Sequence, residues 1–214
     1  MVANEFKETG KYDYCFNEFV FKVIPSASEC LDIGCWTGNL GQVLINQRRC
    51  LVDGVDCNRQ ALNIAKKRGY RKIYNFDLNL RHFSKTIRSK YDCIIFADVL
   101  EHLINPGEVL KEAGNLLKKD GLIIISIPNI AFIQNRVNLL LGRFEYNSRG
   151  GLMDVDHLRF FTSKSIRKLC EDAGYKRVEV RGYALVKNRF FFLRFLTEIC
   201  PSLFALQYLV KLSK

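Results

Sequence analysis

The sequence predicts an α/β fold with a mostly parallel sheet. Apolar segments of strand length alternate with helical patterns along the chain, and the first of these strands, Glu29–Ile33, ends in a glycine-containing loop. A later segment, Leu122–Ile127, is apolar throughout, as expected of a strand that is buried on both faces. The length of 214 residues lies within the usual range of one domain, so we expect 1–214 to form a single domain.

Hydrophobic patterns and residues typical of helix ends define the remaining elements. We expect a helix at Tyr12–Val23 before the first strand, and a short helical turn at Phe83–Arg88. Lys118–Gly121 is interpreted as a helix stop followed by a turn. The other expected strands are Leu51–Val55, Lys72–Phe76, Asp92–Ala97 and Lys176–Arg181, and the other helices are Asn39–Gln47, Arg59–Arg68, Gly107–Leu117 and Ser163–Ala173, the last capped by Thr162 or Ser163.

Two segments toward the C-terminus have less regular patterns. Ile130–Phe161 is weakly periodic, and we interpret it as an insertion of about 130–161 that covers the acceptor side of a site. Arg189–Ile199 fits a helix that packs on the core, before a last strand at Leu206–Leu212. The same phenylalanine-rich segment also fits peripheral membrane contact through 189–200, and the two interpretations can hold together. A spanning helix is not expected, since no run of about 18 uncharged apolar residues occurs.

The loop after the first strand predicts a binding site. Gly34 tolerates the positive φ of a sharp turn, and Gly38 removes a side chain from the surface that a ligand would contact. Asp32 lies at the carboxyl edge of the strand, where open α/β sheets bind ligands. The Gly-x-x-x-Gly spacing differs from dinucleotide and P-loop motifs, and no lysine follows that could bind a phosphate. The pattern therefore indicates a nucleoside without phosphates.

Acids follow the next strands at the same edge of the predicted sheet. Asp56 comes about 20 residues after the glycine loop, the separation at which an acid usually binds ribose hydroxyls. Asp77 could accept a hydrogen bond from an adenine amine while Leu78 packs on the ring. After the fourth strand, Asp98, Glu101 and His102 have the i, i+3, i+4 spacing that places side chains on one face of a helix.

The motifs LDIGCWTG, VDGVD, NFDL, FADVLEHL and LKKDGLIIISIPN, in this order, resemble those of class I S-adenosylmethionine-dependent methyltransferases. HLRFFTSKSIRKLCEDAGY resembles the subgroup with ubiquinone-type O-methyltransferases. The resemblance implies a Rossmann-like, seven-stranded, mostly parallel sheet with helices on both faces and an antiparallel last strand. Trp36 departs from the family, which usually has a small residue there. The resemblance also implies S-adenosyl-L-methionine as cofactor, bound by Tyr12, Asp32, Gly34, Cys35, Gly38, Asp56, Cys57, Asp77, Leu78 and Asp98.

The chain has only three histidines, His82, His102 and His157, and these are candidates for a catalytic base. An acceptor hydroxyl must lose a proton during methyl transfer, so a base or a metal helps. We expect Glu101, His102 and His157 to be catalytic, with the insertion bringing His157 near the other two. Metal-dependent relatives carry a similar set, so Glu101, His102 and His157 could alternatively bind a divalent metal such as Mg or Zn. His82 is predicted to be a surface residue.

The charge of the chain indicates its partners, and its cysteine content indicates its cellular compartment. A net charge of +11 favours an anionic partner, but scattered basic residues and the lack of an RNA-binding module make nucleic acid possible without favouring it. The chain has eight cysteines but no Cys-x-x-Cys pair, which predicts free thiols. Met1–Gly10 is polar and does not resemble a signal peptide. We therefore expect a cytoplasmic protein, or alternatively one that is peripheral to a membrane.

The expected function is O-methylation of a small molecule or of a glycan or lipid intermediate. An RNA 2′-O-methyltransferase and a non-catalytic S-adenosylmethionine-binding subunit are the alternatives. Retention of Asp32, Gly34, Asp56 and Asp77 argues against a subunit that binds no cofactor. The sequence leaves the acceptor and the oligomeric state open.

Overall fold

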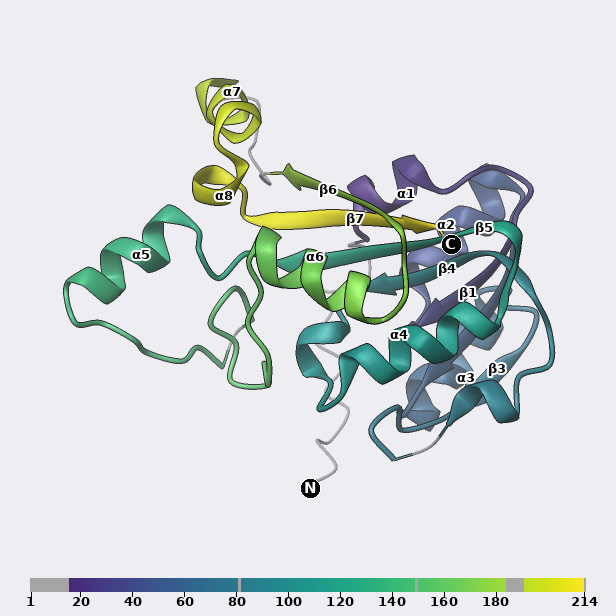
Figure 1. The fold of residues 1–214 in the computed structure, drawn as a ribbon. Helices are drawn as coiled ribbons and strands as arrows, with labels where there is room; N and C mark the ends of the chain where they lie inside the picture. The colour runs from purple at the N-terminus through teal and green to yellow at the C-terminus, as the bar shows by residue number, and fades with distance from the viewer. Residues whose placement is uncertain (1–15, 81, 149, 184–190, 214) are drawn as a thin grey trace.

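A seven-stranded sheet forms the centre of the molecule. The computed structural model describes residues 16–80, 82–148, 150–183 and 191–213. The sheet order is β3-β2-β1-β4-β5-β7-β6, and β7 runs antiparallel to both of its neighbours (Figure 1). The predicted mostly parallel sheet with an antiparallel last strand is confirmed. The strands are β1 (Glu29–Ile33), β2 (Leu51–Asp56), β3 (Ile73–Asn75), β4 (Tyr91–Ala97), β5 (Leu117–Pro128), β6 (Arg177–Tyr183) and β7 (Gln207–Ser213).

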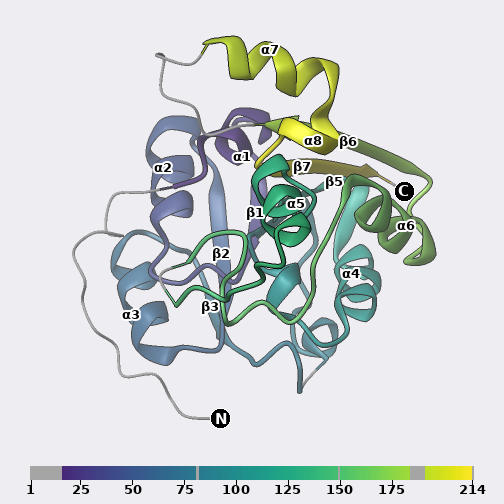
Figure 2. The ribbon, with the colours of Figure 1, turned by 90° about the vertical axis from the view of Figure 1, so that its left-hand side faces the viewer.

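Helices cover both faces of this sheet, as predicted. α1 (Glu18–Val23), α2 (Asn39–Arg48) and α3 (Arg59–Lys67) contribute Val20, Leu44, Leu62 and other buried side chains to one core. α4 (Pro106–Asn115) and α6 (Ser163–Asp172) contribute to the second core on the opposite face. Figure 2 shows α2 and α3 on one side of the strands and α4 and α6 on the other. Each large apolar side chain removed from water contributes about 1.5–3 kcal/mol, so these two cores supply most of the driving force.

Side-chain caps determine where the helices start. Asn17 accepts hydrogen bonds from the backbone nitrogens of Phe19 and Val20, so α1 begins at Glu18. The predicted start at Tyr12 is therefore wrong for residues 16 and 17, while residues 12–15 lie outside the described part of the chain. The predicted cap of α6 is confirmed, since the Thr162 side chain accepts from the backbone nitrogen of Ser165.

The start of β5 differs from the prediction. Lys118–Gly121 lies inside this strand and is not a turn that precedes it. The pairing advances from Tyr91 to Cys93 on β4 and from Leu117 to Leu122 on β5, so the extra residues of β5 form a bulge. A Cβ at Gly121 would lie 3.0 Å from the Tyr91 carbonyl oxygen, which explains the glycine. The predicted turn is therefore wrong, because the pairing of Leu117 before it and Leu122 after it with β4 keeps this segment in the strand.

The insertion begins after β5 and ends before α6. Asn129 and Phe161 form a parallel bridge, so its two ends lie side by side. Between them, α5 (Ile133–Leu140) projects away from the sheet (Figure 1). The remaining short elements are the 3₁₀ turns η1 (Phe83–Lys85) and η2 (Leu100–His102), and the helices α7 (Phe191–Ile199) and α8 (Pro201–Phe204). No helix in the described ranges combines the length and hydropathy needed to cross a bilayer.

Candidate functional site

The loop after β1 turns sharply through its glycines. Gly34 has a φ of +70°, as predicted, and a Cβ there would approach Val99 Cγ2 to 2.5 Å. Gly38 also has a positive φ, of +83°, but the space beside it is filled by the Tyr70 ring, 2.6 Å from an added Cβ. The prediction that Gly38 makes room for a ligand is therefore wrong. Its missing side chain makes room for a core tyrosine.

Tyr70 supports the floor of this loop, and sequence reasoning missed it. Its hydroxyl donates to Asp32 Oδ2 at 2.6 Å and accepts from the backbone nitrogen of Gly41 at 3.1 Å. Burial raises the pKa of Asp32 to about 7, although the hydrogen bond from Tyr70 opposes this shift. A Cβ at Gly41 or at Gly54 would also collide with the Tyr70 ring. Gly38, Gly41 and Gly54 thus all leave room for the Tyr70 ring, a relationship that only the structure shows.

A small cavity joins the glycine loop to the end of β4. It has a volume of about 220 Å³. Of the predicted cofactor residues, Asp32, Gly34, Cys35 and Asp98 line it, together with Trp36, whose side chain is 48% exposed. The residues of the first strand end and of the fourth strand end thus meet in one cavity, as predicted from their positions at the same sheet edge.

The other predicted cofactor residues lie at the ends of β2 and β3. Asp56 Oδ2 accepts from the backbone nitrogen of Trp36 at 2.8 Å, and its Oδ1 accepts from that of Asn58 at 2.8 Å. Burial raises the pKa of Asp56. Cys57 directly follows Asp56 and is exposed. Burial, followed by the charges of Asp56 and Asp77, raises the pKa of Cys57. Asp56 therefore holds the glycine loop against β2.

Leu78 and Tyr12 complete the predicted set. Leu78 is partly buried and packs against the core, so only part of its side chain can contact a ligand. Tyr12 lies outside the described residues.

Asp98 belongs to a polar network that sequence reasoning also missed. Its Oδ1 accepts from Ser126 Oγ at 2.9 Å and from Gln207 Nε2 at 3.0 Å. Gln207 Oε1 in turn accepts from the Tyr183 hydroxyl, which also accepts from Asn17 Nδ2 at 2.8 Å. These partners come from α1, β5, β6 and β7, so no local sequence pattern links them. The network fixes one wall of the cavity.

The spacing of Asp98, Glu101 and His102 does not produce one α-helical face. Asp98 has a φ of +56°, and the helical turn η2 begins only at Leu100. Asp98 therefore faces β5 and β7, whereas Glu101 and His102 face the insertion. The left-handed backbone at Asp98 separates the two groups.

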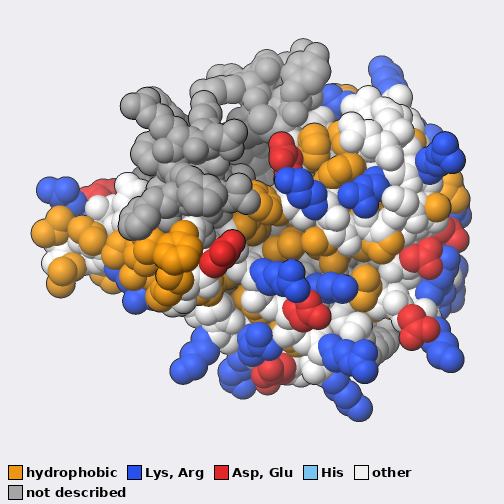
Figure 3. Space-filling model, turned by 90° about the horizontal axis from the view of Figure 1, so that it is seen from above, with side chains coloured by type: hydrophobic (Ala, Val, Ile, Leu, Met, Phe, Trp, Pro, Cys, Tyr) orange, Lys and Arg blue, Asp and Glu red, His pale blue; other side chains and the backbone are white. Residues whose placement is uncertain are grey.

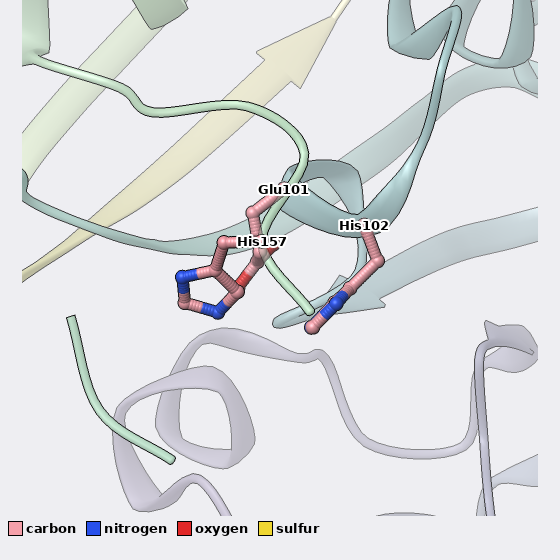
Figure 4. Close-up of side chains that lie close together, drawn as sticks. All are labelled: Glu101, His102 and His157. Carbon is pink, nitrogen blue, oxygen red and sulfur yellow. The ribbon is translucent and has the colours of Figure 1, made fainter. Parts of the chain in front are cut away.

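Glu101, His102 and His157 come together between η2 and the insertion. Their ligand atoms all lie within 4.8 Å of one another, and the two imidazole centroids are 4.9 Å apart. Figure 4 shows the three side chains directed into the same space, with Glu101 and His102 from η2 and His157 from the insertion. The predicted approach of His157 to Glu101 and His102 is confirmed.

Backbone carbonyls orient both imidazole rings. His102 Nδ1 lies 3.0 Å from the Asp156 carbonyl oxygen, and His157 Nδ1 lies 3.3 Å from that of Leu152. Since a carbonyl oxygen only accepts, each Nδ1 carries the proton in the neutral ring, and Nε2 keeps its lone pair. Burial, followed by the neighbouring His102, lowers the pKa of His157.

Glu101 is the most unusual group of the cluster. It is 1% exposed, and neither carboxylate oxygen accepts a hydrogen bond from another described residue. Burial, followed by the negative charge of Asp98, raises the pKa of Glu101 well above its ordinary value. A buried carboxyl without partners costs free energy in the isolated protein, which is typical of a group that serves a proton or a cation.

Comparison with known proteins identifies the family. A family model described as a methyltransferase domain matches residues 11–180, which is more than half of the chain. The chain belongs to this methyltransferase family. With its seven-stranded sheet, it is a class I S-adenosylmethionine-dependent methyltransferase, as the sequence motifs predicted.

Curated relatives of this methyltransferase include two ubiquinone biosynthesis O-methyltransferases. That of Glaesserella parasuis is 34% identical over 106 residues, covering 46% of this chain and 44% of the relative. That of Coxiella burnetii is 23% identical over 166 residues, covering 75% of this chain and 69% of the relative. The chain thus spans less than half of the first relative and about two thirds of the second.

Solved structures share the fold of the methyltransferase. A possible histamine N-methyltransferase from Thermotoga maritima has a TM-score of 0.64 at 18% identity, covering 92% of this chain and 86% of its own. An S-adenosylmethionine-dependent methyltransferase from Archaeoglobus fulgidus has a TM-score of 0.63 at 18% identity, covering 92% and 89%. At this identity the likeness concerns the fold alone.

Three further observations concern the rest of the methyltransferase. His82 is exposed and pairs with Glu112, so the predicted surface position is confirmed. The seven cysteines within the described ranges carry free thiols, as predicted. A larger groove of about 480 Å³ lies between α4 and α6, but it contains none of the predicted site residues.

Proposed function

We propose that the methyltransferase acts on a hydroxyl oxygen of a small molecule or of a glycan or lipid intermediate. The observation that carries this proposal is the buried, unpartnered Glu101 carboxylate beside two imidazoles with free Nε2 atoms. A hydroxyl must lose a proton as it is methylated, and this cluster offers acceptors for that proton. The O-methyltransferase names of both curated relatives support the choice of oxygen.

His157 serves as the base in this proposal. The acceptor oxygen attacks the methyl carbon, the carbon–sulfur bond of the sulfonium breaks, and S-adenosylhomocysteine leaves. The hydroxyl proton passes to His157 Nε2. Because burial lowers the pKa of His157, the ring is neutral near pH 7 and can accept it. The carbonyl of Leu152 holds the ring in the required tautomer.

The same residues fit a divalent metal, which we propose as the second form of this mechanism. Glu101 supplies a carboxylate that lacks hydrogen-bond partners, and His102 and His157 supply Nε2 atoms. Backbone carbonyls on Nδ1 are the usual support of metal-binding histidines. A bound divalent ion would lower the pKa of the acceptor hydroxyl. Glu101 would then remain ionised, which offsets the cost of its burial.

A methyl-transfer screen tests the function. The protein is incubated with radiolabelled S-adenosylmethionine and separate pools of small phenols and alcohols, glycans, lipid extract and RNA. Each pool is tested with added Mg²⁺ or Zn²⁺ and with a chelator. We expect base-stable label in the small-molecule, glycan or lipid pool. Label in RNA alone would favour the 2′-O-methyltransferase alternative and contradict the proposal.

A further inference from the structure

A group of large apolar side chains covers the outside of the insertion. Val137 is 44% exposed, Leu140 85%, Leu141 59%, Phe144 51% and Tyr146 55%. We call these five residues the arm surface. They follow one another along α5 and the loop after it, and the rings of Phe144 and Tyr146 are in edge contact. Figure 3 shows hydrophobic side chains gathered on the arm at the left of the view.

α5 presents apolar side chains to solvent. Its half-buried Asn135 and Asn138 line a cavity of about 320 Å³ within the insertion, together with apolar residues that include Leu139 and Phe144. Val137, Leu140 and Leu141 have the i, i+3, i+4 spacing of one face and are exposed, and α5 buries none of its residues. Exposed apolar patches of this kind mark interaction sites.

Charge decides which partner fits the arm surface. Arg136 directly precedes the arm surface, and Arg143 lies within it, between Leu141 and Phe144. Both are exposed, as is the single acid Glu145, so the stretch is basic on balance within a chain of net charge +11. A second copy would bring two strongly positive molecules together, whereas an anionic lipid surface attracts basic residues and also accepts apolar side chains. We propose that the arm surface docks on an anionic membrane.

Docking here would place the catalytic cluster close to the bilayer. The loop after α5 pairs with the segment before His157, since Asn147 and Asp154 form a bridge. The arm surface and His157 therefore belong to one insertion. The proposal does not depend on which acceptor is methylated.

α7 provides a second contact with the same membrane. Phe195 is 56% exposed and Ile199 64%, at the i, i+4 spacing of one helical face. α8 connects this helix to the arm, because the Ser202 carbonyl accepts from the Arg136 guanidinium at 3.3 Å. This agrees in position with the membrane contact expected at 189–200, of which α7 is the described part.

Co-sedimentation with vesicles tests the proposal. The full chain is mixed with phosphatidylglycerol–phosphatidylcholine vesicles or with phosphatidylcholine alone. We expect binding to the anionic vesicles and at least about tenfold weaker binding by Leu140→Asp/Leu141→Asp, because two exposed apolar anchors become charged. Arg143→Glu should weaken binding by about fivefold or more.

Leu80→Asp is the matched control. Leu80 is 73% exposed but lies between β3 and η1, far along the chain from the arm, so this variant should bind vesicles like the wild type. Wild-type protein that ignores anionic vesicles, or a double variant that binds them equally, would overturn the proposal. So would a wild-type dimer by light scattering that the double variant lacks, since the arm surface would then bind a second copy.

Discussion

The backbone nitrogen of Leu158 donates a hydrogen bond of 2.8 Å to the carbonyl oxygen of Glu101. Arg159 donates to the same oxygen at 2.9 Å. These bonds attach the segment of the insertion that precedes α6 to the turn after β4, so the main chain holds His157 beside Glu101. Main-chain hydrogen bonds thus position the cluster, and its members can be tested one at a time.

Asp56→Ala should weaken S-adenosylhomocysteine binding by at least about tenfold, because charge-assisted hydrogen bonds contribute about 1.5–3 kcal/mol. Asp56 also holds the amide of Trp36, so the loop loses support in the same variant. Calorimetric titration measures the affinity, with circular dichroism to confirm folding. Asp172→Ala, at the exposed end of α6, should bind normally. Wild-type affinity in Asp56→Ala would exclude Asp56 from the ribose role.

Tyr70→Phe should lower the free energy of unfolding by about 1–3 kcal/mol, since the buried Asp32 loses its hydrogen-bond donor. The loss should be larger at pH 8.5 than at pH 5.5, because the pKa of Asp32 is about 7 and the ionised form needs the donor most. Denaturant unfolding at both pH values measures it. The exposed Tyr146→Phe serves as control. Equal losses at both pH values would contradict the assignment.

Glu101→Gln should make the protein more stable at pH 8 in the absence of metal. The pKa of Glu101 is raised on folding, so its contribution to stability is present below the ordinary pKa and is lost as pH rises. Glutamine cannot ionise, and the pH dependence should flatten. Thermal melts from pH 5 to pH 8 measure this.

Thermal melts with added divalent metal distinguish the mechanism in which His157 is the base from the mechanism that uses a metal. If the cluster binds metal, added Mg²⁺, Mn²⁺ or Zn²⁺ should raise the melting temperature of the wild type and leave that of Glu101→Gln unchanged. An equal rise in both proteins would place the metal elsewhere.

Trp36 offers a direct reporter of cofactor binding. It is the one tryptophan of the chain, it lines the cavity, and its side chain is half exposed. S-adenosylhomocysteine should therefore shift or quench its fluorescence with the dissociation constant found by calorimetry. Its φ of +47° favours glycine, so Trp36→Gly should fold. Unchanged emission at saturating ligand would show that the indole faces away from the bound cofactor.

The sequence predicted the sheet because each strand carried its own signal. Asp32 lies near the end of β1, and Gly34 and Asp98 follow the ends of β1 and β4. In a parallel sheet strand ends meet at one edge, so their cavity could be foreseen. Tyr70 could not, because its contacts with Asp32 and Gly41 join residues far apart in the chain.

Other differences arose where long-range contacts override local patterns. Lys118–Gly121 has the composition of a turn, yet pairing with β4 keeps it within β5. Asp98 has helical spacing to His102, yet its hydrogen bonds to Ser126 and Gln207 hold it outside the turn. Ile130–Phe161 is only weakly periodic, so the sequence did not predict α5 or the exposure of its apolar side chains.

The most direct test of the catalytic cluster compares methyl transfer with cofactor affinity in His157→Ala. The rate is measured with the acceptor pool that the screen identifies, and the affinity with S-adenosylhomocysteine. We expect the rate to fall by about 100-fold or more, as for loss of a general base, with the dissociation constant within about twofold of the wild type. The wild-type rate should also decline at acidic pH, with its midpoint below that of an ordinary histidine, since burial lowers the pKa of His157. An unchanged rate in His157→Ala, at unchanged cofactor affinity, would contradict the account.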